Sequence, residues 1–296
     1  MQTAQFELHA KVEDRHWWFV ARRQILRRVI GQFLAPSSET TIIDVGCGTG
    51  GNVAALAGDY RCLGIDASAE AIELARQRFP QLEFVHGFAP ADIGDEFQRA
   101  SLVILNDVLE HVEDDRGLLA ELVGALAPGA HVLLTVPADP ALWSPHDVAF
   151  GHFRRYRQPQ FERVWEGLPV DVQFVSAFNA RLYPIVRAVR TWNRWRGETS
   201  GASGTDFNTP PAPVNRALER LFAGEGRRLA ALAAGKTVRP YRHGVSLMAL
   251  LRRADATLSS PPALADGGSQ QDSSAIAPAV TPQIAWPTGE NAETTL

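Results

Sequence analysis

Cysteines and long apolar runs are scarce in this chain, and its start does not resemble a secretion signal. Only two cysteines, Cys47 and Cys62, occur among 296 residues, and their spacing is not that of a metal site, so we expect small buried thiols. No run approaches the roughly 20 apolar residues of a transmembrane helix. The opening MQTAQFELHAKVEDRHWWF lacks a basic segment followed by an apolar one. These absences predict a cytoplasmic protein.

Basic residues are absent from the C-terminal tail. Residues 254–296 contain five acids and neither Lys nor Arg, and are rich in Ala, Ser, Pro, Thr and Gly, so we expect this tail to be disordered. Within a net charge of −4, residues 1–178 carry −9 and residues 179–253 carry +10. The basic part either binds an anionic partner or substrate, or attracts the acidic half of the same chain.

A strand, a glycine turn and a helix follow one another near residue 44. The apolar run 41–43 leads into DVGCGTG at 44–50, and a helix-like stretch covers 52–57. Glycines at 46, 48 and 50 permit a sharp turn and a close approach of a ligand to the backbone. A dinucleotide fold uses G-x-G-x-x-G to bind a pyrophosphate. Here the spacing is G-x-G-x-G, and the preceding Asp44 would repel phosphate and suits a cation.

The second strand, CLGID at 62–66, ends on Asp66, 20 residues after Gly46. A carboxylate there can hold a ribose diol with both of its oxygens. Together, DVGCGTG and GIDAS resemble the first two motifs of class I S-adenosylmethionine-dependent methyltransferases. The segments 101–112, with LEHV, and 126–137, with a Pro-Gly turn, are similar to later elements of that family in the expected order.

The resemblance implies an α/β fold: a Rossmann-like, seven-stranded, mostly parallel sheet with helices on both faces. We expect one methyltransferase domain over residues 1–253, with an N-terminal helical cap (5–35), a helical insertion (179–240) and an antiparallel pair of strands (170–178 and 243–251) at the end of the sheet. It also implies S-adenosyl-L-methionine as the cofactor, although the acid often found beside adenine is missing near Phe88. The implied cofactor-binding residues are Asp44, Gly46, Cys47, Gly48, Gly50, Asp66, Ala67, Phe88, Asn106 and Asp107.

Two further motifs resemble a bacterial subgroup of this family. The segment HWWFVARR at 16–23 is similar to its HWWFxxRR opening, which implies that Trp17, Trp18 and Phe19 close the pocket while Arg22 or Arg23 meets an anionic group. The alternative is a helix packed on the sheet with solvated arginines.

The segment HDVAFGHFRRY at 146–156 is similar to the subgroup's HDxxxGHxRRY motif and follows the fifth strand, where a loop reaches the ligand crevice. Three interpretations are open: substrate binding or acid-base work, a structural ion-pair network, or a metal site formed by His146, Asp147 and His152. The first is preferred and needs no metal.

The insertion begins with a basic, tryptophan-containing stretch, NARLYPIVRAVRTWNRWRG, at 179–197. On a helix, Leu182, Ile185, Val186, Val189 and Trp192 share one face, and Arg187, Arg190 and Arg194 another. Such a helix fits an anionic membrane surface or a phosphorylated lipid, or else it is a lid that buries its apolar side. Pro184 predicts a late start or a break.

The preferred hypothesis is an enzyme that transfers methyl in line to O, N or C of a small-molecule or lipid-linked acceptor with an anionic group. No nucleic-acid module is evident. The enzyme is expected in the cytoplasm, and peripheral contact with the inner membrane face is one of the two alternatives for the insertion helix. Alternatives are a cofactor-binding scaffold without turnover and an NAD-type oxidoreductase. The candidate bases are His111, His146 and His152, and the candidate substrate-binding residues are Trp17, Trp18, Arg22, Arg23, Arg154, Arg155 and Tyr156.

Overall fold

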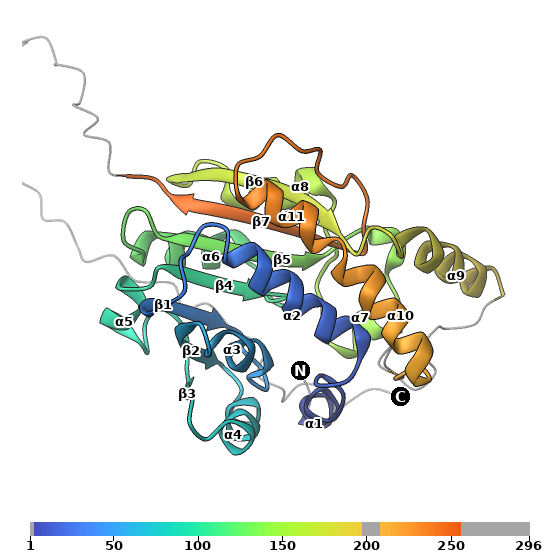
Figure 1. The fold of residues 1–296 in the computed structure, drawn as a ribbon, viewed down its shortest axis with the longest axis horizontal. Coiled ribbons are helices and arrows are strands. Elements are labelled where there is room, and N and C mark those ends of the chain that lie inside the picture. The colour runs from blue at the N-terminus through green and yellow to red at the C-terminus, as the bar shows by residue number, and fades with distance from the viewer. Residues whose placement is uncertain (1–2, 197–207, 256–296) are drawn as a thin grey trace, which may run out of the picture.

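A seven-stranded sheet in the order β3-β2-β1-β4-β5-β7-β6 forms the centre of the molecule, described by a computed structural model over residues 3–196 and 208–255 (Figure 1). The strands are β1 Ser37–Val45, β2 Tyr60–Asp66, β3 Glu83–His86, β4 Leu102–Asn106, β5 His131–Pro137, β6 Val170–Phe178 and β7 Ser246–Arg253. Strands β1 to β5 are parallel, whereas β7 pairs antiparallel with both β5 and β6. The predicted fold class is confirmed.

Helices cover both faces of this sheet (Figure 1). They are α1 Thr3–Val12, α2 Trp17–Ile30, α3 Gly51–Leu56, α4 Ala69–Arg78, α5 Gly94–Gln98, α6 Asp115–Ala125, α7 Pro145–Ala149, α8 Gln158–Glu162, α9 Tyr183–Trp195, α10 Ala212–Ala223 and α11 Gly226–Ala233. Strand side chains alternate between the two layers, so that Ile42 joins the core beneath α2, α10 and α11, while Ile43 joins the core beneath α5, α6 and α8. Both faces of the central strands are therefore buried.

Ligands of open parallel sheets bind outside the carboxyl ends of the strands, where the strand order reverses. In this sheet the reversal lies between β1 and β4. Three residues that follow strands at this edge have left-handed backbones although they are not glycine: Asp107 after β4 (φ 56°), Asp139 after β5 (φ 54°) and Asn179 after β6 (φ 52°). Such strain clusters at functional sites. The carboxyl edge of the sheet is therefore the candidate site.

The insertion before the last strand contributes helices to two places. α10 and α11 pack on α2 through Phe222 and Leu229, and β6 and β7 pair along their length despite the insertion between them. α9 projects beyond the carboxyl edge of the sheet (Figure 1). It begins at Tyr183 and has Pro184 in its first turn, which is the late start that Pro184 predicted. Within the described ranges, no helix has the length and apolar character needed to cross a bilayer. The predicted disordered tail lies outside the described residues except for 254 and 255.

Candidate active site

The glycine turn after β1 is closely packed on two sides and open on the third. A Cβ on Gly46 (φ 70°) would lie 2.6 Å from a methyl group of Val108, and one on Gly50 (φ 83°) would lie 2.7 Å from the ring of Phe84. At Gly48 (φ 54°), by contrast, a Cβ would meet no heavy atom within 4 Å. The turn therefore holds its shape by close packing and leaves room beside Gly48 for a ligand.

Asp44, which ends up beneath this turn, is a buried carboxylate without a hydrogen bond. Its side chain is 2% exposed, and neither oxygen has a hydrogen-bond partner among the described residues. Burial raises the pKa of Asp44 to about 7, while the nearby charge of Arg22 and the amide of Asn52 act in the opposite direction. A cationic ligand would compensate this charge, so the residues present fit the ammonium of the expected cofactor.

Asp66, at the end of β2, accepts backbone hydrogen bonds with both oxygens. Oδ2 accepts from the Gly48 amide at 2.8 Å and Oδ1 from the Ser68 amide at 2.9 Å. Each carboxylate oxygen can accept a second bond, so Asp66 is oriented by the turn and can still receive two ribose hydroxyls. The neighbouring Ala67 directs its carbonyl to His86 at 3.1 Å.

Phe88 follows β3 and is 42% exposed, which leaves its ring available to an adenine. Its amide donates to Asp92 Oδ2 at 2.7 Å. The sequence offered no acid at this place, but the chain turns at residues 88–92 and brings the Asp92 carboxylate back beside Phe88. Asp92 is therefore a candidate adenine contact that the linear spacing did not reveal.

Arg22 reaches from α2 to the ends of β4 and β5. Its guanidinium contacts Asp107 Oδ2 at 2.6 Å and donates to Thr135 Oγ1 at 2.9 Å, and it lies over the ring of Trp18 at 4.7 Å. The Thr135 hydroxyl in turn donates to Asn106 Oδ1 at 3.2 Å. The side chain of Arg22 is 8% exposed, so the alternative of solvated arginines does not describe it.

The other residues of the HWWF segment face different neighbours. The ring of Trp17 lies 6.0 Å from that of Phe222, and its amide donates to Asn215 Oδ1 at 3.0 Å, so Trp17 packs against α10. Arg23 donates to the Glu13 carbonyl at 2.6 Å. These contacts fasten the N-terminal segment, and a direct substrate contact of Trp17 or Arg23 stays a prediction.

Glu13, a residue that the sequence analysis did not single out, ties the N-terminal segment to the glycine turn. It is 7% exposed, accepts from Thr49 Oγ1 at 2.7 Å and forms an ion pair with Arg78. A Cβ on Gly51 would also collide with its carboxylate. The chain just after α1 is thereby joined to the glycine turn, and Gln5 of α1 is bonded to the carbonyl of Ala149.

The side chains of Arg154, Arg155 and Tyr156 in the second motif contact other residues of the same chain. Arg154 pairs with Asp115 at 2.8 Å, and the Tyr156 hydroxyl donates to the same carboxylate at 2.7 Å. Arg155, 9% exposed, donates to Asp147 Oδ1 at 2.7 Å and to the Ala138 carbonyl at 3.2 Å. This arrangement corresponds to the structural network, one of the three interpretations of the motif.

Asp147 is the centre of that network. Besides Arg155, it accepts from the Ser144 amide at 2.8 Å and contacts His152 Nδ1 at 2.9 Å. Both carboxylate oxygens therefore already have partners, which disfavours the metal site made from His146, Asp147 and His152.

Four histidines lie close to one another between α1 and the end of β4. The ring of Phe150 lies between His9, at 5.3 Å, and His146, at 4.3 Å, and the rings of His111 and His152 are 4.7 Å apart. Burial lowers the pKa of His9 to about 4 and that of His111 to about 3. His9 had no signal in the sequence, because α1 meets the site only after folding. A pKa of about 3 makes His111 a weak proton acceptor.

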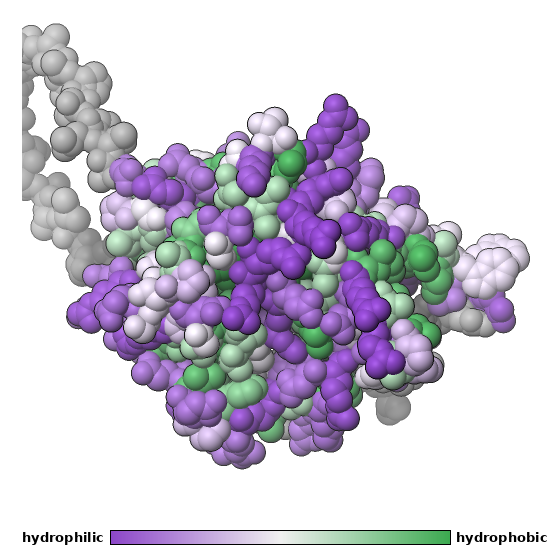
Figure 2. All heavy atoms as spheres, viewed as in Figure 1, coloured by the Kyte–Doolittle hydropathy of each residue, from purple (hydrophilic) through white to green (hydrophobic). Residues whose placement is uncertain are grey.

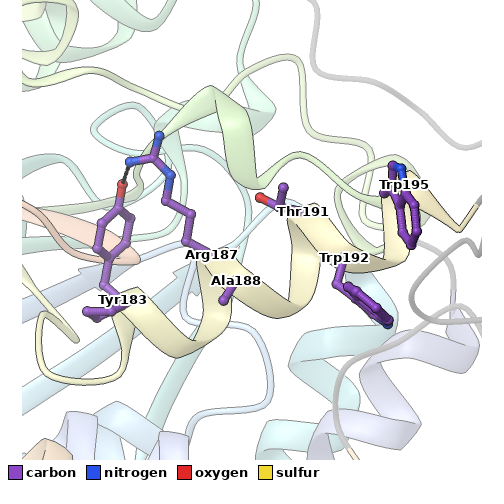
Figure 3. A pocket seen from close by; sticks show the side chains of 7 residues that line it. Tyr183, Arg187, Ala188, Thr191, Trp192 and Trp195 are labelled. Atoms are coloured by element: carbon purple, nitrogen blue, oxygen red, sulfur yellow. Dashed lines mark hydrogen bonds between the residues drawn. The ribbon is translucent and has the colours of Figure 1, made fainter.

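Two adjoining hollows lie beside the end of β5. One, of about 360 Å³, is lined by polar residues that include Asp139, Arg157, Arg242 and His243. The other, of about 750 Å³, follows α9 from Tyr183 to Trp195 (Figure 3). Tyr183 and Arg187 line both, and Tyr183 donates to Asp139 Oδ2 at 2.7 Å. The hollows form one basic and partly apolar surface leading to the carboxyl edge.

Comparisons with known proteins identify the family of this chain. Residues 18–178 match the family model described as a methyltransferase domain. Curated relatives include trans-aconitate 2-methyltransferases from Azoarcus sp. (33% identity over 40% of this chain and 46% of the relative) and Paracidovorax citrulli (27% identity over 53% and 61%). The matches thus span about half the length of these relatives.

Similar solved structures include two enzymes. Phosphoethanolamine N-methyltransferase 2 of Haemonchus contortus with S-adenosyl-L-methionine has a TM-score of 0.48 and 16% identity, covering 78% of this chain and 52% of that one. Geranyl diphosphate C-methyltransferase of Streptomyces coelicolor has a TM-score of 0.48 and 13% identity, covering 77% and 78%. Since the family model matches more than half of the chain, the protein belongs to the methyltransferase domain family.

Proposed function

We propose that this protein transfers a methyl group from S-adenosylmethionine to O, N or C of a small-molecule or lipid-linked acceptor that carries an anionic group. The observation that carries the proposal is Asp44, a buried carboxylate without a hydrogen bond, beneath a glycine turn with room beside Gly48. A pyrophosphate would add negative charge to this place, whereas an ammonium compensates it. The NAD-type alternative is therefore disfavoured.

The cofactor supplies a methyl group activated by a sulfonium, so the protein contributes mainly alignment and exclusion of water. Asp44 would bind the ammonium and Asp66 the ribose. The Arg22–Asp107 pair forms a wall at the end of β4, and α1, fastened by Glu13, covers the crevice. For an acceptor that must lose a proton, His146 and His152 remain the candidate bases.

The proposed acceptor class follows from the hollow at the end of β5. Arg157, Arg187 and Arg242 line it together with His243, and arginine forks suit carboxylates and phosphates. Several of the curated relatives are trans-aconitate methyltransferases, whose name specifies an anionic acceptor. Both observations favour an acceptor whose carboxylate or phosphate binds away from the reacting atom.

Transfer of labelled methyl from S-adenosylmethionine into small molecules and lipids of a cell extract tests the function, with mass spectrometry to identify the product. We expect a labelled product that depends on the protein. A protein that binds the cofactor but labels nothing in either fraction would support the scaffold alternative instead.

The R157Q and R242Q variants should raise the KM for the identified acceptor about ten- to a hundredfold each, because a hydrogen bond to a charged group contributes about 1.5–3 kcal/mol. Cofactor affinity should stay unchanged. R99Q, which alters an exposed arginine after α5, is the matched control. Steady-state kinetics with each variant provides the measurement, and an unchanged KM in both pocket variants would exclude the hollow as the anion site.

We further propose that α9 contacts an anionic lipid surface. The apolar face of this helical segment is only partly buried in the folded protein. Leu182 is buried, whereas Ile185, Trp192 and Trp195 are 61%, 56% and 78% exposed. α9 contains three arginines and no acid. At the end of the molecule where α9 projects, a small group of hydrophobic residues lies at the surface beside hydrophilic ones (Figure 2). These exposed fractions do not fit a lid that buries its whole apolar side. Basic amphipathic helices that contain tryptophan suit a lipid interface.

Flotation with vesicles of phosphatidylglycerol and phosphatidylcholine should show binding that weakens with salt. Replacing Trp192 and Trp195 together by Ser should lower vesicle affinity at least about tenfold, since burying one large apolar side chain contributes about 1.5–3 kcal/mol. Trp143, 38% exposed outside α9, gives the control variant W143S. Equal flotation of both variants would contradict the assignment to α9.

A further inference from the structure

A buried carboxylate and two imidazoles meet just after β4. Glu110, His111 and His152 each offer one ligand atom, and these three atoms lie within 4.8 Å of one another. Glu110 is 0% exposed, and neither of its carboxylate oxygens has a hydrogen-bond partner among the described residues. An unpartnered buried carboxylate is costly unless something that the structure does not contain binds it.

Backbone contacts hold these three residues close together. Glu110 and His111 belong to the short helical turn Leu109–His111, and the amide of Phe153 donates to the Glu110 carbonyl at 2.7 Å. This bond brings the loop of the second motif back to the end of β4 and sets the ring of His152 4.7 Å from that of His111. Tertiary structure thus brings His152 to the turn that contains Glu110 and His111.

The orientation of His152 is that of a metal ligand. Its Nδ1 contacts Asp147 Oδ1 at 2.9 Å, and Asp147 is itself fixed by Arg155 and Ser144. A carboxylate on one ring nitrogen leaves the other, Nε2, as the ligand and raises its basicity. The structural network of the second motif therefore has a purpose, which is to orient His152.

We propose that Glu110, His111 and His152 bind one divalent transition-metal ion, such as Zn²⁺, Mn²⁺ or Fe²⁺. Two histidines and one carboxylate leave coordination positions open, which an oxygen of a ligand can occupy. Ligand atoms about 2.1 Å from one ion are at most about 4.2 Å apart, so binding requires only a small closure of the group. Because the group lies next to Asp107, the ion would anchor an oxygen of the methyl acceptor, a role that rests on the proposed function and leaves His146, and not His152, as the candidate base.

Metal titration of the tag-free, EDTA-treated full-length chain tests the site. Calorimetry with Zn²⁺ should give one ion per chain, and Co²⁺ should give visible absorption bands typical of a site with histidine ligands. E110Q and H152N should each weaken Zn²⁺ binding at least about 100-fold, and the Zn²⁺-induced rise in melting temperature should disappear. The control is H131A, which removes a histidine beside Phe33, away from the group.

Absence of stoichiometric binding in the wild type would overturn the proposal, as would unchanged Zn²⁺ affinity in both variants. If the variants do not fold, X-ray absorption spectroscopy at the zinc edge of the wild type decides, because a spectrum without imidazole scattering would exclude the histidine ligands. Calorimetry with S-adenosylmethionine on the same samples separates the two proposals. Cofactor binding without metal binding would overturn only the metal site, and metal binding without cofactor binding would overturn only the proposed function.

Discussion

Replacing Asp44 by Asn is expected to abolish detectable binding of S-adenosylmethionine and, in the same protein, to raise the stability of the ligand-free form. The carboxylate is buried without a hydrogen bond, and burial raises its pKa from 3.8 to about 7. At pH 7.5 the folded protein therefore contains a buried charge whose desolvation the charge of Arg22 and the amide of Asn52 offset only in part. A neutral amide removes that cost and also removes the partner of the cofactor's ammonium.

The sign of the pH dependence follows from the raised pKa. Between pH 4 and 7 the folded protein holds a proton on Asp44 that the unfolded chain has already released, so the free energy of unfolding falls as pH rises through this window. A shift of about three units corresponds to at most about 4 kcal/mol. Chemical denaturation at pH 4.5 and 7.5 should therefore show D44N gaining stability over the wild type mainly at pH 7.5.

The matched control is D95N, which neutralises an exposed acid in α5. It should leave cofactor affinity unchanged and show no comparable pH-dependent gain in stability. If D44N bound S-adenosylmethionine as tightly as the wild type, Asp44 would not be the ammonium partner. If it were less stable than the wild type at pH 7.5, the burial argument would be wrong.

Replacing Glu13 by Ala is expected to release the N-terminal segment from the glycine turn. The change removes the partner of the buried Thr49 hydroxyl and one of the two carboxylates that the Arg78 guanidinium contacts, so that only its pair with Asp14 at 3.0 Å remains. Breaking a buried ion pair by removing one partner costs about 3–5 kcal/mol. We expect faster dissociation of the cofactor and rapid proteolysis within residues 3–30, which stopped-flow kinetics and limited proteolysis would measure.

The control is E7A. Glu7 lies in the same segment but forms an exposed pair with Lys11, with side chains 56% and 74% exposed, and such pairs contribute about 0–1 kcal/mol. Its cofactor dissociation rate should stay near that of the wild type. Equal rates in E13A and the wild type would show that α1 does not retain the cofactor.

The glycine turn and the strands could be predicted because their signals are local. Asp44 and Asp66 terminate apolar strands, and a terminal acid on a parallel strand can only lie at the carboxyl edge of the sheet. The strand Val170–Phe178 was predicted with the bounds that it has in the structure. Its apolar residues and the residues that flank it form one continuous stretch of sequence, so the signal is local. The last strand was expected over 243–251 and runs from Ser246 to Arg253, a shift typical of boundaries between loop and strand.

The contacts that close the site could not be predicted in the same way. Glu13 meets Thr49 and Arg78, which are 36 and 65 residues away along the chain, and no spacing rule connects them. The charged residues of the second motif were recognised as unusual, but their roles depend on Asp115 and Asp147, whose positions tertiary folding decides. The same holds for Glu110, since its burial without a partner is a property of the packed protein.

Isothermal calorimetry of the purified chain with S-adenosylmethionine, S-adenosylhomocysteine and NAD tests the central claim, that the turn after β1 binds a cationic sulfonium cofactor. We predict one site per chain for S-adenosylmethionine and S-adenosylhomocysteine, and no heat of binding for NAD. Stoichiometric NAD binding, with none for the sulfonium compound, would contradict the account.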